Sequence, residues 1–289
     1  MVAMRFAPSP TGQLHLGHAY SALVAHDLAR DLGGRFLLRI DDIDGGRCQP
    51  KFAQAIVDDL DWLGLTPDTP PVFQSQRTAR YDAALQKLIG IGLAYPCFCS
   101  RAQIAAEVAA SAAAPHGAVA THYPGTCRTL DPSQRLDRIS AGHPHCWRLD
   151  MASALARGRM RCKIDVVRQN IWGDPSGHGD IVLARRDAAS AYHLASTVDD
   201  AAMGISHVVR GNDLVHATTI HLLLQALLDL PTPDYVHHRL VGNPHGVRLA
   251  KRHNAATLVA MRDTGVDPLE LVDNLRCQRL PLGFAWVSV

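Results

Sequence analysis

Several features are missing from this sequence of 289 residues, and each absence excludes a class of protein. No apolar run is long enough to cross a bilayer, and no apolar signal-peptide region follows Met1. Lys and Arg number 29 against 27 Asp and Glu, which is not the basic balance of a non-specific nucleic-acid binder. A local basic face could still contact a nucleic acid. We therefore expect a cytoplasmic protein with no membrane partner.

Apolar residues make up 47% of the chain, which is enough to form a sizeable core. The length suits one large domain or two modest ones. The seven cysteines are an odd number in a chain without an export signal. We interpret them as reduced thiols, some of them candidates for metal binding, rather than as disulfides.

The N-terminal part predicts a βαβ unit with parallel strands. Its elements are a short strand at Arg5 to Pro8, a helix at Leu16 to Arg30 stopped by Gly33-Gly34, and an apolar strand at Arg35 to Ile40. A second α/β stretch is expected further on, with strands at 180–183 and 207–211 and helices at 190–198 and 218–230. The pattern predicts an α/β fold around a Rossmann-like parallel sheet.

The most specific motif runs from Arg5 to His18 and ends in His-x-Gly-His. His15 and His18 lie three residues apart, so they share one face of a helix turn. Gly17 leaves room for a flat base against the backbone, and a helix N-terminus attracts phosphate. Taken alone, such a pair is most often two ordinary surface or core histidines, and a zinc site is a second alternative. The residues that precede them favour a nucleotide.

Those preceding residues, Ala-Pro-Ser-Pro-Thr-Gly, resemble the first signature of class I aminoacyl-tRNA synthetases, and specifically of the glutamyl branch. The resemblance implies ATP-dependent activation of L-glutamate, with Mg²⁺ accompanying the ATP. It implies that ATP is bound by His15, Gly17 and His18. It also implies a glutamate site that includes the first strand and its loop, namely Arg5, Phe6, Ala7, Pro8 and Ser9.

Further residues match the glutamate site of this branch. Asp41 ends the second strand, where ligands bind in parallel α/β sheets and where a carboxylate can hold an ammonium group. The branch usually has glutamate at this position, so Asp41 keeps the charge with a reach shorter by one methylene. By resemblance, Tyr192 and Arg210 complete the pocket, and an Arg can pair bidentately with a carboxylate.

A basic pentapeptide, Arg248 to Arg252, resembles the second class I signature. In this branch the signature is Lys-Leu-Ser-Lys-Arg. Arg248 occupies the position of the first lysine and Ala250 that of the serine, whereas the second lysine is retained as Lys251. The resemblance implies that Lys251 faces the leaving pyrophosphate. Without that context the segment would be an ordinary solvated basic loop.

Three cysteines flank an Ala-rich insert, and three thiolates can hold zinc if a fourth ligand is present. The pattern Cys97-x-Cys99…Tyr123-x₃-Cys127 is similar to the zinc site of glutamyl-queuosine tRNA(Asp) synthetases, a group within this branch. The resemblance implies a structural Zn²⁺ with Tyr123 as the fourth ligand. His122 is the chemical alternative.

About 37 residues follow Arg252, which is too few for an anticodon-binding domain. A short catalytic core with this cysteine pattern resembles the glutamyl-queuosine group, and the resemblance implies activation of glutamate without tRNA and its transfer to queuosine in the anticodon of tRNA(Asp). A monomer is the default expectation. Two alternatives remain, an adenylyltransferase with a small-molecule acceptor and a tRNA-binding relic without activity. The expected divisions are a first half of the catalytic domain (1–95), a zinc-binding insertion (96–146), a second half (147–235), and the signature loop with a short helical C-terminal segment (236–289).

Overall fold

The computed structural model describes residues 1–112, 123–157, 174–247, 249 and 257–287. These residues form two compact units, each described by itself. The first comprises Met1–Arg77, Asp200–Val215 and Thr232–Val289, and the second comprises Thr78–Asp199 and His216–Pro231. No helix among the described residues is long and apolar enough to span a membrane.

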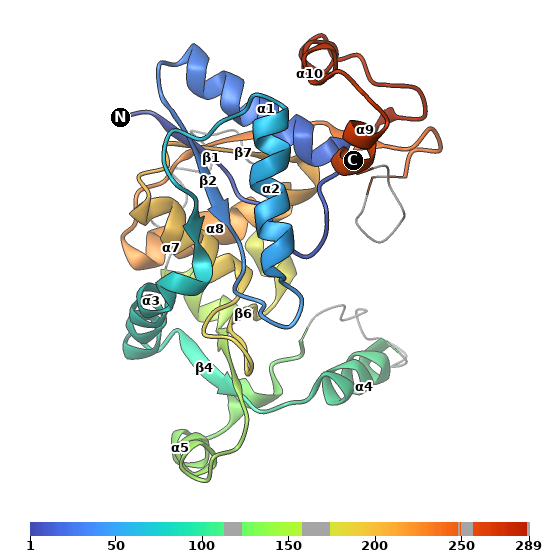
Figure 1. Ribbon diagram of the computed structural model, residues 1–289. Helices are drawn as coiled ribbons and strands as arrows, with labels where there is room; N and C mark the ends of the chain where they lie inside the picture. The colour runs from blue at the N-terminus through green and yellow to red at the C-terminus, as the bar shows by residue number, and fades with distance from the viewer. Residues whose placement is uncertain (113–122, 158–173, 248, 250–256, 288–289) are drawn as a thin grey trace. The chain divides into compact units, whose positions relative to one another are not determined.

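The first unit is built on a five-stranded parallel sheet (Figure 1). Its strands are β1 (Ala3–Phe6), β2 (Arg35–Ile40), β3 (Val72–Phe73), β7 (His207–Gly211) and β8 (Asp234–His238), in the order β3-β2-β1-β7-β8. The order reverses at the β1–β7 pair, and open parallel sheets bind ligands beyond the carboxyl ends of the strands at such a point. The predicted Rossmann-like α/β class is confirmed, and β2 and β7 have the predicted bounds.

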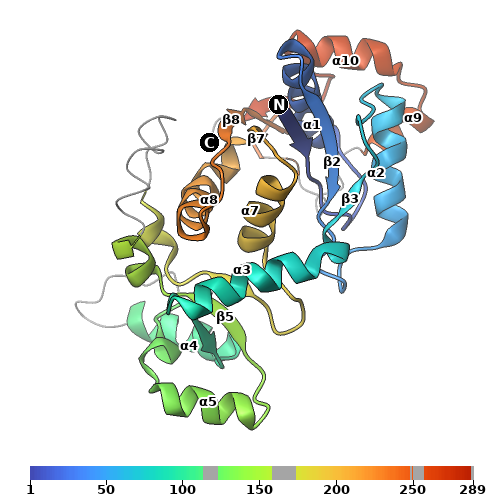
Figure 2. The same cartoon turned by 90° about the vertical axis from the view of Figure 1, so that its left-hand side faces the viewer.

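Helices cover one face of this sheet. They are α1 (Leu16–Asp31), α2 (Pro50–Trp62), α9 (Leu258–Asp263) and α10 (Pro268–Arg276), and their apolar residues share one core with Met4, Phe36 and Leu38 (Figure 2). Shorter pieces are η1 (Gln74–Arg77), η4 (Asn212–Leu214), and an antiparallel pair of strands, β9 (Leu240–Gly242) and β10 (Ala285–Val287). Gly33 has a φ of 61°, which ends α1 where the Gly-Gly pair predicts.

The second unit contains a separate three-stranded antiparallel sheet of β4 (Ala94–Cys97), β5 (Cys146–Leu149) and β6 (Val182–Ala184). Around it lie helices α3 (Thr78–Gly90), α4 (Arg101–Ala112), α5 (Pro132–Ser140), α7 (Tyr192–Ala202) and α8 (Val215–Leu228), with the short η2 (Thr126–Thr129) and η3 (Pro175–His178). Residues 151–157 are also helical. The last residues of α7, from Asp200, belong to the first unit.

The strand expected at 180–183 is thus found at Val182–Ala184, in the small antiparallel sheet. The sequence placed this strand in the second α/β stretch together with 207–211, because an apolar run predicts a buried strand but carries no information about the sheet that it joins.

Candidate active site

The N-terminus of α1 is organised by the two histidines of the first motif. His15 is the N-cap residue, and its Nδ1 accepts the Gly17 N–H at 3.2 Å. His18 Nδ1 accepts the His15 N–H, also at 3.2 Å, and the two ring centroids lie 3.8 Å apart. Each neutral ring must therefore carry its proton on Nε2. The arrangement makes both rings Nε2–H donors at the positive end of a helix dipole.

Gly17 has no room for a side chain at this turn. A Cβ built on it would lie 3.2 Å from the Cε1 and Nδ1 atoms of His15 and 3.8 Å from Val241 Cβ. A Cβ at this position would therefore crowd the His15 ring, which would have to shift by a few tenths of an ångström.

The second signature lies largely outside the described residues, and this includes Lys251, Arg248 and Ala250. The residues on either side are described. The Leu249 N–H donates to Val241 O at 3.1 Å, and Thr257 forms a β-bridge with His15. The Leu258 N–H also donates to Leu14 O at 2.9 Å. The described residues on the two sides of the signature thus contact Val241 and His15.

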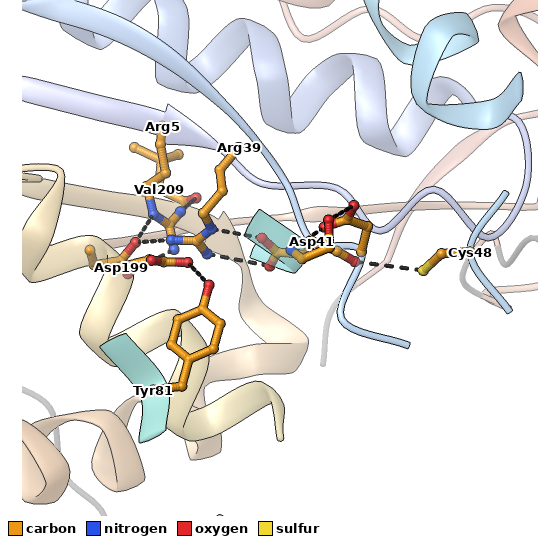
Figure 3. A network of polar contacts seen from close by, with 10 residues as sticks. Arg5, Arg39, Asp41, Cys48, Tyr81, Asp199 and Val209 are labelled. Carbon is orange, nitrogen blue, oxygen red and sulfur yellow. Dashed lines mark hydrogen bonds and ion pairs between the residues drawn. The ribbon is translucent and has the colours of Figure 1, made fainter. Parts of the chain in front are cut away.

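A buried charge network lies on the sheet face opposite α1 and α2 (Figure 3). Side chains alternate between faces along a strand, so Arg5 and Arg39 share the face of Ala3 and Leu37. Asp200 accepts from Arg5 Nε at 2.9 Å and from Arg39 Nη1 at 2.6 Å. Arg39 also pairs with Asp41, with its Nε 2.6 Å from Oδ1. The two cations and two carboxylates balance in charge.

The environment of the two carboxylates differs. Burial raises the pKa of Asp41, and the attraction of Arg39 offsets only part of that rise. Burial also opposes ionisation of Asp200, but Arg5 and Arg39 together hold the pKa of Asp200 below its ordinary range. The two arginines thus favour the ionised form of Asp200 more strongly than Arg39 favours that of Asp41.

The loop after β1 is tied to the end of β2, because the Asp41 N–H donates to Pro8 O at 3.0 Å. Ser9 is exposed, Ala7 is half-buried, and Phe6 points into the core on the α1 side. Arg210, near the carboxyl end of β7, is 4% exposed and lies over the Tyr235 ring at 5.1 Å. The structure thus brings Arg5, Pro8, Asp41 and Arg210 to one edge of the sheet.

Tyr192 begins α7 in the second unit, so its part in the glutamate pocket stays a prediction. Its ring lies 5.2 Å from that of His193 and 5.5 Å from that of His221. In the same unit, Asp199 accepts the Tyr81 hydroxyl at 2.7 Å (Figure 3).

Three thiols in the second unit form a cluster that could hold a metal ion. The Sγ atoms of Cys97, Cys99 and Cys127 all lie within 4.8 Å of one another, with Cys99 and Cys127 3.4 Å apart. The Tyr123 hydroxyl is 3.8 Å from Cys99 Sγ and accepts the Cys127 N–H at 2.7 Å. Residue 122 lies outside the described residues. The donor set of three thiols with a phenol beside them fits a thiophilic ion such as zinc.

Cys146 adds a fourth thiol next to this cluster, opposite Cys97 in the β4–β5 ladder. Its hydrogen bond lowers the pKa of Cys97 to about 4, although burial opposes the shift. Burial raises the pKa of Cys99 to about 12. The first negative charge of the cluster is therefore carried by Cys97.

Sequence reasoning missed three residues that these sites contain. Arg39 lies two residues before Asp41, and Asp200 lies eight residues after Tyr192, but the sequence analysis gave neither of them a role. Cys146 has no motif around it, and only the strand register brings it opposite Cys97.

The parallel sheet and the paired histidines are those of a class I synthetase catalytic domain. Residues 1–281 match the family described as tRNA synthetases class I (E and Q), catalytic domain. Over 287 residues the chain is 44% identical to the glutamyl-Q tRNA(Asp) synthetase of Rhodobacter capsulatus, a match that covers 92% of this chain and 97% of that relative. A relative of the same name from Symbiobacterium thermophilum is 42% identical, with coverages of 95% and 85%. The chain belongs to the glutamyl-Q tRNA(Asp) synthetase family.

Solved structures agree on the fold. The glutamate-tRNA synthetase of Elizabethkingia anophelis superposes with a TM-score of 0.77 at 25% identity, covering 95% of this chain. A glutamate tRNA ligase from Elizabethkingia meningosepticum, solved in complex with its amino acid, gives 0.76 at 26% identity. The chain spans 61% and 60% of the length of these two structures.

Proposed function

We propose that this protein activates L-glutamate with ATP, without tRNA, and then transfers the glutamyl group to queuosine in the anticodon of tRNA(Asp). The observation that carries this proposal is the 44% identity to a glutamyl-Q tRNA(Asp) synthetase over 97% of that relative. The paired histidines at the N-terminus of α1 support it, because they suit the phosphates of ATP.

The first step needs no general base, since an α-carboxylate is already ionised at neutral pH. One of its oxygens attacks the α-phosphorus of ATP, the bond to the β-phosphate oxygen breaks, and pyrophosphate leaves. His15 and His18 donate their Nε2–H groups to phosphate oxygens, and Lys251 neutralises the leaving group. Mg²⁺ bound to ATP supplies further neutralisation of the phosphates. Catalysis then consists of alignment and charge stabilisation.

The amino acid is held at the carboxyl ends of β1, β2 and β7. Asp41 receives its ammonium group, and Arg5 and Arg210 supply positive charge for its carboxylates. Phe6, Ala7, Pro8 and Ser9 shape the pocket, and Tyr192 completes it. Arg39 and Asp200 orient Arg5 and Asp41 through the buried ion pairs.

Zn²⁺ would be held by Cys97, Cys99, Cys127 and Tyr123, where it supplies a structural cross-link and no chemistry. We further infer that the protein acts as a monomer in the cytoplasm, which sedimentation and cell fractionation check.

The decisive experiment compares charging of tRNA(Asp) that carries queuosine with charging of tRNA(Asp) that lacks it. We expect glutamate to be attached only to the first, and at the anticodon. Equal charging of both, or esterification of the 3′ end, contradicts the proposal. In ATP–pyrophosphate exchange, glutamate should stimulate the reaction, whereas aspartate and glutamine should not. Absence of exchange with a folded protein would instead favour a tRNA-binding relic.

A further inference from the structure

The small sheet of the second unit has two chemically different faces. Cys97 pairs with Cys146 and Tyr95 with Arg148, so these four side chains lie on the face of the metal cluster. The register places Pro96 opposite Trp147 on the other face, and continuing it by one position places Phe98 opposite His145. The second face therefore carries three aromatic rings in sequence.

Ring geometry confirms this arrangement. The centroids of Phe98 and His145 are 5.5 Å apart, and those of His145 and Trp147 are 5.6 Å apart. All three side chains are half-buried. His145 is held in place because its Nδ1 lies 3.1 Å from the His143 carbonyl oxygen. We name Phe98, His145 and Trp147 the aromatic strip.

Two exposed arginines flank the strip. The Arg138 guanidinium lies over the Phe98 ring at 5.5 Å from its centroid. Arg186 donates from Nη2 to the carbonyl oxygens of Phe98 and Cys99, both at 2.7 Å. Among the described residues, neither arginine has a carboxylate within ion-pair distance. The strip is therefore bordered by positive charge that the described protein does not neutralise.

Aromatic rings next to arginines are the surface on which proteins stack unpaired bases while holding the adjoining phosphates. A base that is modified within a loop must leave its stack, and its neighbours then lose stacking energy. We propose that the aromatic strip stacks unpaired bases of the tRNA substrate, with Arg138 and Arg186 contacting the flanking phosphates. This inference rests on the proposed function in one respect, namely that the RNA is tRNA(Asp).

The test uses the full-length protein with Trp147→Leu, Phe98→Leu and Arg138→Gln variants. Trp286→Leu is the matched control, because Trp286 is also half-buried but lies in the first unit, where its indole N–H donates to Gln278 O. Three quantities are measured for each variant: the Kd for queuosine-containing tRNA(Asp), glutamate-dependent ATP–pyrophosphate exchange, and bound zinc. Transfer of glutamate to the tRNA and sedimentation are measured as well, for the wild-type protein and the leucine variants.

We expect the Kd for tRNA to rise about 10-fold or more in the two leucine variants. The Arg138→Gln variant should weaken binding less and reduce its salt dependence. Exchange and zinc content should stay within about two-fold of wild type, and Trp286→Leu should change none of the three.

An unchanged tRNA Kd in Trp147→Leu overturns the proposal, as does a change in sedimentation that shows the strip to be a protein interface. If the wild-type protein transfers glutamate to the tRNA but the leucine variants bind the tRNA with an unchanged Kd, the role of the aromatic strip is wrong and the proposed function stands. If the wild-type protein binds the tRNA and the leucine variants bind it more weakly, but no glutamate is transferred, the proposed function is wrong and the role of the aromatic strip stands. If the wild-type protein binds no tRNA, both are wrong.

Discussion

His15 and His18 each combine a structural and a chemical task. Their Nδ1 atoms accept backbone N–H groups that a helix start would otherwise leave unsatisfied. This fixes the ring orientation and leaves Nε2–H as the donor of each ring. The first signature is therefore a helix cap as well as the proposed phosphate site.

A His15→Asn variant separates these tasks, because Asn is a favoured N-cap residue but lacks the imidazole donor. We expect kcat/KM for ATP–pyrophosphate exchange to fall about 10- to 100-fold, the value of one hydrogen bond to a charged group. Thermal denaturation should show little change in stability. If the variant is strongly destabilised but its folded fraction keeps wild-type ATP–pyrophosphate exchange, His15 has only the capping role and does not bind phosphate.

Asp59 is a buried carboxylate outside the substrate site. It is fully buried in α2, and among the residues that the structure describes neither of its oxygens has a hydrogen-bond partner, while Arg262 Nη1 lies 3.6 Å from Oδ1. Burial raises the pKa of Asp59 to about 6, above its ordinary value of 3.8. The folded state therefore binds this proton more tightly, so the free energy of unfolding falls as the pH rises from about 4 to about 6.

Replacing Asp59 with Leu should stabilise the protein by about 1–3 kcal/mol at pH 8, because no charge remains to be buried. The gain should be smaller at pH 5, where the wild-type carboxyl is mostly protonated. Denaturant unfolding at both pH values measures this. Asp58→Asn serves as the control, since Asp58 is exposed. A gain that does not depend on pH would show that packing, rather than charge, is responsible.

Among the strands and helices, β4, β5 and η2 assemble the thiol cluster. Cys97 ends β4, Cys127 lies in η2, and the β4–β5 register brings Cys146 opposite Cys97. Neighbouring positions of the same two strands carry the aromatic strip. Because side chains alternate between the two faces, one short antiparallel strand pair presents a candidate metal site on one face and the aromatic strip on the other.

A Tyr123→Phe variant tests the fourth ligand. Losing the phenol oxygen should raise the Kd for zinc about 10-fold or more, whereas Cys277→Ser, at an exposed position away from the cluster, should leave it unchanged. Competition with a chelator gives the Kd. Wild-type affinity in Tyr123→Phe would indicate another ligand such as His122. Stoichiometric zinc in Cys99→Ser would refute the site itself.

For the chain as a whole, the strand order decides where we expect substrates to bind. The reversal at β1 and β7 places the substrate edge between residues that are about two hundred positions apart, as in the 195-residue separation of Arg5 and Asp200. The site therefore depends on the complete sheet.

A stable glutamyl-adenylate analogue should slow amide hydrogen exchange at 3–18 and at 207–211, because ligand binding suppresses local opening. Exchange in β4 and β5 should be unaffected. Hydrogen exchange with mass spectrometry, with and without the analogue, checks this. Protection confined to β4 and β5 would place the adenylate site elsewhere.

Prediction from sequence succeeded where local signals are strong. The apolar run of β2 and the Gly-Gly stop after α1 needed only neighbouring residues. The strand β8 was missed because Asp234–His238 is polar and half-exposed, and its pairing with β7 alone makes it a strand. The helix at Leu258–Asp263 was likewise too short to show a period.

The sequence alone settled the chemistry of the individual groups: imidazoles and a glycine at a helix start, a carboxylate after a strand, and thiols at metal-ligand spacing. These depend on residues within a few positions of one another. The tertiary structure settled which charges neutralise which, pairing Arg5 and Arg39 with Asp200 and placing Cys146 opposite Cys97. Such pairings follow from sheet order and register, which are long-range properties that no local pattern encodes.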